Sequence, residues 1–158
     1  MPNATNTADT IDILGPQIRF LTPLLDDPDA YCVISAVVPP NVVVPLHSHR
    51  ERETFLILSG KLEAFAESGW RTYSAGELFD VPSGARHALR NTSGAAVSLA
   101  LITTASMGRF FRSVGRPAAD FPPGPPALKA IQEFTAASIR HGYWLASPSE
   151  NADIGIAF

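Results

Sequence analysis

The feature that most constrains the fold is a series of short apolar segments, separated by turns, between Tyr31 and Thr103. These segments are rich in β-branched residues or alternate between apolar and polar residues, which is typical of strands. None predicts a helix long enough to connect parallel strands, so the sheets should be antiparallel. Turn residues recur roughly every eight to twelve residues, which favours an all-β sandwich or barrel. The predicted strands are residues 31–38, 42–44, 54–59, 61–67, 70–74, 77–82, 85–91 and 95–103.

The composition indicates one globular domain. Of the 158 residues, 46% are hydrophobic and 17% are charged, which provides for a sizeable core. The net charge is −3 without a cluster of Lys and Arg, so nucleic-acid binding is not expected. No apolar stretch approaches the roughly 20 residues that span a bilayer. The N-terminal residues lack the pattern of a signal peptide, and we expect a cytoplasmic protein without membrane contact.

The cysteine content agrees with that expectation. Cys32 is the only cysteine, so no internal disulfide can form. Its neighbours are apolar, and the thiol is predicted to be buried as a small hydrophobic side chain.

The chain divides into three parts. Residues 1–10 are predicted to be a flexible tail. Residues 11–104 are predicted to form the β-domain, and residues 105–158 a helical extension packed on it. The proline-rich residues 116–126 are predicted to be a stiff connector within this extension.

Two helices are predicted in the extension. The first would be capped by Ser106 and ended by Gly115, with an apolar stripe formed by Phe110, Phe111 and Val114. The second would begin after Pro125-Pro126 and end at Gly142. Its predicted apolar stripe is Leu128, Ile131, Phe134 or Thr135, and Ser138 or Ile139.

Four residues are spaced as metal ligands. His47 and His49 would lie on one face of a strand, because residues two apart point the same way. Glu53 could return to the same point after a bend at residues 50–52, and His87 could approach from another strand. Three imidazoles and one carboxylate suit Fe, Mn, Ni, Cu, Co or Zn. From the spacing alone, a metal site and a set of hydrogen-bonded histidines without a metal are equally good interpretations.

Two segments resemble the paired motifs of the cupin superfamily. The first is "HSHRERETFLILSG" and the second is "GELFDVPSGARHALRN". The matching positions, in the family's order and spacing, are His47, His49, Glu53 and Gly60, then Gly76, Pro82, Gly84, His87 and Asn91. One position departs, because Asn41 stands where the family usually has Gly. Asn is the next residue best able to adopt positive φ.

The resemblance implies an antiparallel jelly-roll β-barrel of the cupin type. It implies that His47, His49, Glu53 and His87 face the interior and hold one divalent metal, while Asn91 is a structural hydrogen-bonding residue. Glu51 lies two residues from both His49 and Glu53 and is the alternative carboxylate ligand. Arg50 and Arg52 are predicted to point to solvent, Arg86 to point away from the metal, and His141 to be a surface or capping histidine of the second helix.

The resemblance extends to the small single-domain bacterial cupins that are similar to quercetin dioxygenases. It implies a dioxygenase-like oxidoreductase acting on a small phenolic or enol substrate that chelates the metal. Phe55, Ile57 and Leu89 are predicted to line a dry substrate pocket, and Glu53 is predicted to accept a proton as well as to bind the metal. The alternatives are a non-oxidative isomerase, cyclase or lyase, and a non-catalytic small-molecule-binding module. A homodimer is expected, in part because residues 42–44 are apolar.

Overall fold

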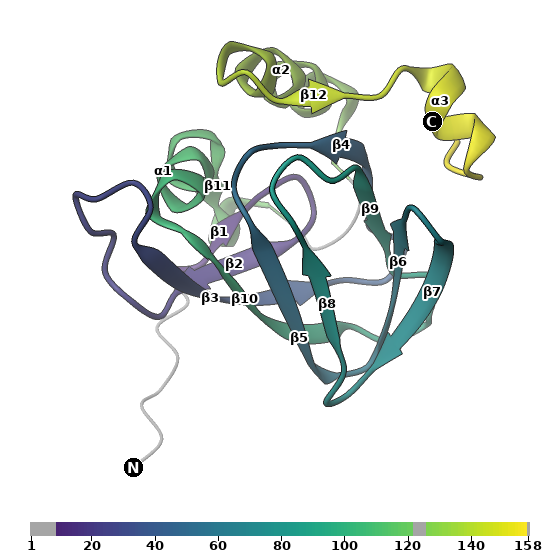
Figure 1. Ribbon diagram of the computed structural model, residues 1–158, viewed down its shortest axis with the longest axis horizontal. Coiled ribbons are helices and arrows are strands. Elements are labelled where there is room, and N and C mark those ends of the chain that lie inside the picture. The colour runs from purple at the N-terminus through teal and green to yellow at the C-terminus, as the bar shows by residue number, and fades with distance from the viewer. Residues whose placement is uncertain (1–8, 122–125, 158) are drawn as a thin grey trace.

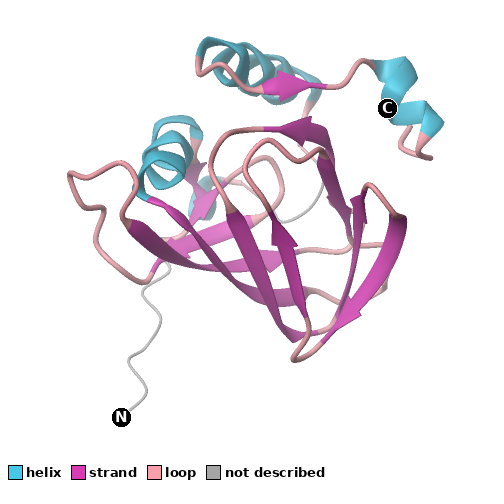
Figure 2. Ribbon diagram, viewed as in Figure 1, coloured by secondary structure: helices cyan, strands magenta, loops and turns pink. Residues whose placement is uncertain are grey.

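The computed structural model describes residues 9–121 and 126–157, which form two antiparallel sheets with helices at one end (Figures 1 and 2). The predicted tail lies mostly outside these residues, as do Pro125 and part of the connector. One sheet has seven strands in the order β11-β1-β2-β3-β10-β5-β8, and the other has five in the order β12-β4-β9-β6-β7. This arrangement confirms the predicted all-β jelly-roll class.

The strands follow the predicted segments closely. The seven-stranded sheet contains β1 (Ile11–Asp12), β2 (Gln17–Phe20), β3 (Tyr31–Val38), β5 (Glu53–Ser59), β8 (Leu78–Val81), β10 (Val97–Thr104) and β11 (Arg116–Pro117). The five-stranded sheet contains β4 (Val43–Ser48), β6 (Lys61–Ala66), β7 (Gly69–Ser74), β9 (His87–Arg90) and β12 (Trp144–Leu145).

The hydrophobic core lies between the two sheets. Along β3, burial alternates with the period of a strand, and every second side chain from Cys32 onward is buried. The largest fully buried side chains come from both sheets and include Ile34, Ile57, Leu62 and Leu99. Cys32 is fully buried and free, as predicted.

Two turns next to the motif strands have a backbone conformation with positive φ, at Gly60 and Asn41. Gly60 turns the chain from β5 into β6 with φ of +84°, and an added Cβ would lie 2.9 Å from the carbonyl oxygen of Ala96. Asn41 adopts φ of +66° before β4. The departure from the family's glycine is therefore accommodated, because Asn tolerates this conformation.

Helix α1 (Ala105–Val114) begins directly after β10 and packs on the barrel. The prediction that Ser106 caps it is wrong. Thr104 is the last extended residue before the helix and accepts the hydrogen bond from the Met107 amide, so Ser106 lies inside the first turn. The predicted end at Gly115 is correct, since this residue donates its amide to Phe111.

The rest of the extension contains more structure than predicted. It forms a 3₁₀ turn (Ala118–Asp120), α2 (Leu128–Arg140) and α3 (Pro148–Asp153), besides the short strands β11 and β12. Strand β11 pairs with β1, and β12 pairs with β4. The extension therefore joins both sheets, and two-residue strands carry too little periodicity to be predicted.

One predicted helix face is also corrected. Leu128, predicted to lie in the apolar stripe of α2, is 71% exposed, and Ile139 is 61% exposed. Ser138 is the buried residue of this helix, and Phe134 packs on the core. Within the described residues, no helix combines the length and the apolar character needed to cross a membrane.

Candidate metal centre

The histidines of the two motifs meet because β4 and β9 are neighbours. His47 on β4 is the register partner of His87, the first residue of β9. Their ring centroids are 4.2 Å apart, and the ring of His49, just beyond β4, lies 5.0 Å from that of His87. One ligand atom from each of the three rings lies within 4.8 Å of the others.

Glu53 completes this cluster from the seven-stranded sheet. It is the first residue of β5, so the bend after β4 returns the chain to the same place. Its Oε2 lies 3.1 Å from His87 Nε2 and 3.3 Å from His49 Nε2. The side chains of all three residues are at most 5% exposed. The structure thus brings the three histidines into one group and places Glu53 in contact with two of them, His49 and His87.

Each imidazole is oriented by a hydrogen bond from its other nitrogen. His47 Nδ1 lies 2.6 Å from the Pro45 carbonyl, His49 Nδ1 2.9 Å from that of Glu51, and His87 Nδ1 2.9 Å from that of Ala85. A carbonyl can only accept, so each Nδ1 carries the proton. This tautomer leaves Nε2 as a lone pair directed into the cluster, the arrangement found in metal-ligating histidines.

The electrostatics of the cluster match these roles. Burial, with the neighbouring His87 and His49, lowers the pKa of His47 to about 3, so this ring is neutral at pH 7. Burial also disfavours the charge of His49, but the adjacent carboxylate of Glu53 outweighs it and raises the pKa of His49. Burial opposes ionisation of Glu53, yet the contacts with His49 and His87 dominate and lower its pKa.

The donor set fits a divalent transition metal. Because the protons are on Nδ1, the Nε2 lone pairs of His49 and His87 face the carboxylate oxygen Oε2 of Glu53. Lone pairs that face one another repel, so a cation must lie between these nitrogens and this oxygen. In the described residues, His49 Nε2 is a buried atom without a hydrogen-bond partner. A proton or a metal ion can fill this role. Three imidazoles and a carboxylate are ligands that first-row divalent metals accept.

Glu51, the alternative ligand, lies on the other side of His49. Its Oε2 is 3.9 Å from His49 Nδ1, the nitrogen that faces away from the cluster. Its Oε1 accepts hydrogen bonds from Ser106 Oγ at 2.9 Å and Tyr143 Oη at 3.2 Å. The structure therefore places Glu53, and not Glu51, among the Nε2 atoms.

The four side chains predicted to point away from the metal lie at the surface. The side chains of Arg50 and Arg52 are 81% and 68% exposed, and Arg52 pairs with Asp80. Arg86 is exposed, and its guanidinium stacks 4.0 Å from the ring centroid of Trp144. His141 is exposed and caps the C-terminus of α2.

The residues predicted to line a substrate pocket lie in the core between the sheets. Phe55, Ile57 and Leu89 are 6%, 0% and 6% exposed and belong to the main hydrophobic cluster. They line neither of the two cavities described next. Alternation correctly places them on the inner face, but it does not show whether neighbouring side chains fill the space.

A mostly apolar cavity of about 580 Å³ reaches the cluster at His87. Its walls include Phe79 from β8, Leu46 from β4, Phe65 from β6 and Ile154 from the end of the extension. Sequence reasoning missed this cavity. Ile154 lies more than sixty residues from the second motif, and no local pattern indicates that the extension returns there.

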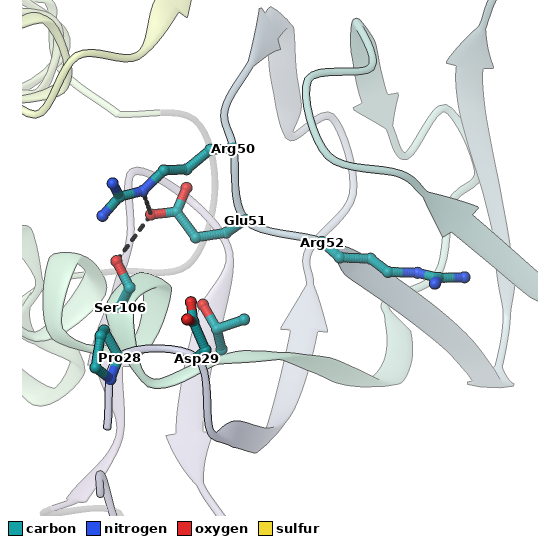
Figure 3. Close-up of a pocket in the computed structure, with 7 residues that line it drawn as sticks. Pro28, Asp29, Arg50, Glu51, Arg52 and Ser106 are labelled. Atoms are coloured by element: carbon teal, nitrogen blue, oxygen red, sulfur yellow. Dashed lines mark hydrogen bonds and ion pairs between the residues drawn. The ribbon is translucent and has the colours of Figure 1, made fainter. Parts of the chain in front are cut away.

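A second cavity, of about 420 Å³, lies on the outer side of the β4–β5 bend (Figure 3). It is bordered by Pro28 and Asp29 ahead of β3, by the bend itself, and by the start of α1. Figure 3 shows Glu51 in this cavity, in contact with Arg50 and Ser106. Glu51 thus lines the second cavity and also lies 3.9 Å from His49 Nδ1.

Comparisons with known proteins identify the class of this fold. Residues 35–103 match the family model for the Cupin domain. The structure is similar to the polyketide cyclase RemF from Streptomyces resistomycificus, at 18% identity and a TM-score of 0.56, covering 66% of this chain and 80% of that one. It is also similar to a cupin 2 conserved barrel domain protein from Salinispora arenicola, at 17% identity and a TM-score of 0.53, covering 83% and 92%.

A third similar structure is a predicted oxalate decarboxylase from Thermotoga maritima, at 21% identity and a TM-score of 0.51, covering 56% of this chain and 79% of that one. The comparison with curated proteins found no match. Residues 35–103 therefore match a Cupin domain, and the similar structures show that the chain has the fold of the cupin barrels. At these identities, the similar structures establish the fold and leave the chemistry to be argued from the site.

Proposed function

We propose that the protein is a metal-dependent cupin enzyme in which His47, His49, Glu53 and His87 hold one divalent ion of Fe, Mn, Ni, Cu, Co or Zn. One observation carries the proposal. Three imidazoles are each tied at Nδ1 to a carbonyl, and their Nε2 atoms converge in a buried cluster beside Glu53. Such a cluster needs a cation, and its donor types match these metals.

The chain's own residues define what the site can do with a substrate. A metal held there would supply a Lewis acid and, where the metal is redox-active, an electron acceptor or donor. The cavity beside His87 is large enough for a small molecule, and its apolar walls exclude water from the bound part. Phe65 and Phe79 in these walls favour an aromatic or other flat apolar substrate. The histidines keep Glu53 ionised, so it can bind a cation, and the same lowering of its pKa makes it a weaker proton acceptor than an ordinary carboxylate.

The specific reaction we propose is dioxygenase-like oxidation of a phenolic or enol substrate. The resemblance of the chain layout to quercetin dioxygenase-like cupins supports this proposal, as does the aromatic wall of the cavity. A non-oxidative isomerase, cyclase or lyase would use the same site, and a polyketide cyclase is among the proteins of similar fold. A non-catalytic binding module would use the cavity alone.

Oxygen uptake by the metal-loaded protein tests this proposal. Flavonols, catechols and enols would be offered in turn to the wild type, to His47→Ala and to His141→Ala, the control histidine outside the cluster. Substrate-dependent oxygen uptake by the wild type and His141→Ala, and not by His47→Ala, is the expected result. Product formation without oxygen uptake would establish the non-oxidative alternative. Saturable binding without turnover of any substrate would contradict an enzymatic role.

We also propose that the protein forms a homodimer, although residues 42–44 do not provide the surface. Val42 is 1% exposed and Val44 packs against the core, so only Val43 lies outside. The outer face of the seven-stranded sheet instead exposes Leu58, Leu78 and Ile102 by 42% to 57%. Sedimentation of the wild type at the mass of a monomer, across a range of concentrations, would refute the dimer.

A further inference from the structure

Glu51 is a buried acidic residue that the four-residue cluster does not use. It lies in the bend between β4 and β5 and is 5% exposed. His49 is placed between two carboxyl groups, with Glu53 3.3 Å from its Nε2 and Glu51 3.9 Å from its Nδ1. A buried carboxyl group is costly unless hydrogen bonds hold it in place, so its partners indicate why it is there.

The partners of Glu51 come from the C-terminal extension. Ser106 on α1 and Tyr143, just before β12, both donate hydrogen bonds to Oε1. In the part of the chain that the structure describes, Oε2 has no hydrogen-bond partner, and it faces the Nδ1 side of His49. The remaining close charge is the exposed guanidinium of Arg50, whose Nε is 3.7 Å from Oε1. Figure 3 shows Arg50 and Ser106 meeting at the carboxyl group of Glu51.

Tyr143 is itself fixed by strand pairing and packing. The two residues after it, Trp144 and Leu145, pair with Ser48 and His47 on β4. Its ring centroid lies 4.8 Å from that of Phe110 and 5.5 Å from that of His49. The extension is therefore attached to the strand that carries His47, and it brings the Tyr143 hydroxyl to the carboxyl group beside His49.

We infer that Glu51 is a positioning residue for His49, held in place by Tyr143 and Ser106. The main-chain oxygen of Glu51 accepts the hydrogen bond from His49 Nδ1 at 2.9 Å, and its carboxyl group adds a favourable electrostatic contact on the same side of the ring. Together they keep the proton on Nδ1 and direct Nε2 toward Glu53. This inference deepens the proposed function with respect to the metal, but the orientation of His49 holds for the metal-free protein as well.

Two variants separate this role from a merely structural one. Glu51→Gln keeps the shape of the side chain and removes its charge, and Tyr143→Phe keeps the packed ring and removes only the hydroxyl. Tyr73→Phe is the control, because the Tyr73 ring packs in the barrel on Phe79 and Arg71. The first readout is the ¹⁵N spectrum of the His49 ring in metal-free protein, which reports the tautomer. The second is the Kd for Co²⁺, together with the visible spectrum of the bound ion.

Both test variants should change the His49 ring nitrogen shifts and weaken Co²⁺ binding by about tenfold, with an altered Co²⁺ spectrum. Tyr73→Phe should match the wild type in both readouts. Unchanged His49 shifts in both test variants would overturn the inference. If the wild type binds no Co²⁺ while the variants still change the His49 tautomer, the metal proposal fails and the positioning of His49 stands.

Discussion

Asn91, the last residue of the second motif, holds together three parts of the barrel and provides a quantitative test of the structure. Its amide donates to the carbonyls of Val38 at 2.9 Å and Ala95 at 2.8 Å. Its side-chain oxygen accepts from the amide and the hydroxyl of Ser93. The side chain is 1% exposed, so replacement by Ala removes four hydrogen bonds that water replaces only in part.

The expected loss follows from the burial of each contact. We assign about 1.5 kcal/mol to the buried bond to Val38 and about 0.5 kcal/mol to each of the three partly buried bonds, which gives about 3 kcal/mol for Asn91→Ala. Ser93→Ala removes only the hydroxyl contacts and should cost less than about 1 kcal/mol. Urea unfolding, followed by tryptophan fluorescence, measures both free energies. If Asn91→Ala were no more destabilising than Ser93→Ala, Asn91 would not connect these segments as the structure shows.

Three further predictions test other parts of the structure. Gly60→Ala should lose at least about 1 kcal/mol of unfolding free energy, because φ is +84° and the new Cβ meets the Ala96 carbonyl; Gly94→Ala, where the Cβ meets nothing within 4 Å, should unfold like the wild type. Hydrogen bonds from Arg90 and Thr92 lower the pKa of Glu63. The ionised carboxylate therefore stabilises the fold at any pH above the ordinary pKa of a glutamate, and this stabilisation is lost as the pH falls through the lowered pKa. The Tm of the wild type should therefore exceed that of Glu63→Gln at pH 7, and a gap that persists in acid would contradict this. Since metal binding must displace protons and Glu53 raises the pKa of His49, the Kd for Co²⁺ should rise from about pH 8 to about pH 6; a constant Kd would argue against histidine ligands.

The strands and the four clustered residues were predictable because both depend on local spacing. Alternation along β3 and β6 follows directly from the two-residue period of a strand. The register of His47 with His87 is a long-range feature, and the resemblance to the cupin motifs predicted only that both residues face the interior and bind the same metal. The position of Glu53 was predictable for the same reason.

The features that were missed depend on how distant segments meet. Ser106 and Thr104 are both suitable helix caps, and the choice depends on where β10 ends. The cavity wall formed by Phe65 and Ile154 arises because the extension folds back on the barrel. The contact of Tyr143 with Glu51 joins residues 92 positions apart. Such contacts are set by tertiary packing and leave no periodic pattern in the sequence.

The metal content of the purified protein tests the central claim most directly. Wild type, His87→Ala and His141→Ala would be purified side by side, incubated with Fe²⁺, Mn²⁺, Ni²⁺, Cu²⁺, Co²⁺ or Zn²⁺, desalted and examined by elemental analysis. We predict close to one ion per chain in the wild type and in His141→Ala, and a large loss in His87→Ala. Absence of stoichiometric metal from the wild type after every incubation would contradict the metal centre. Equal retention by His87→Ala would contradict the role of His87 as a ligand.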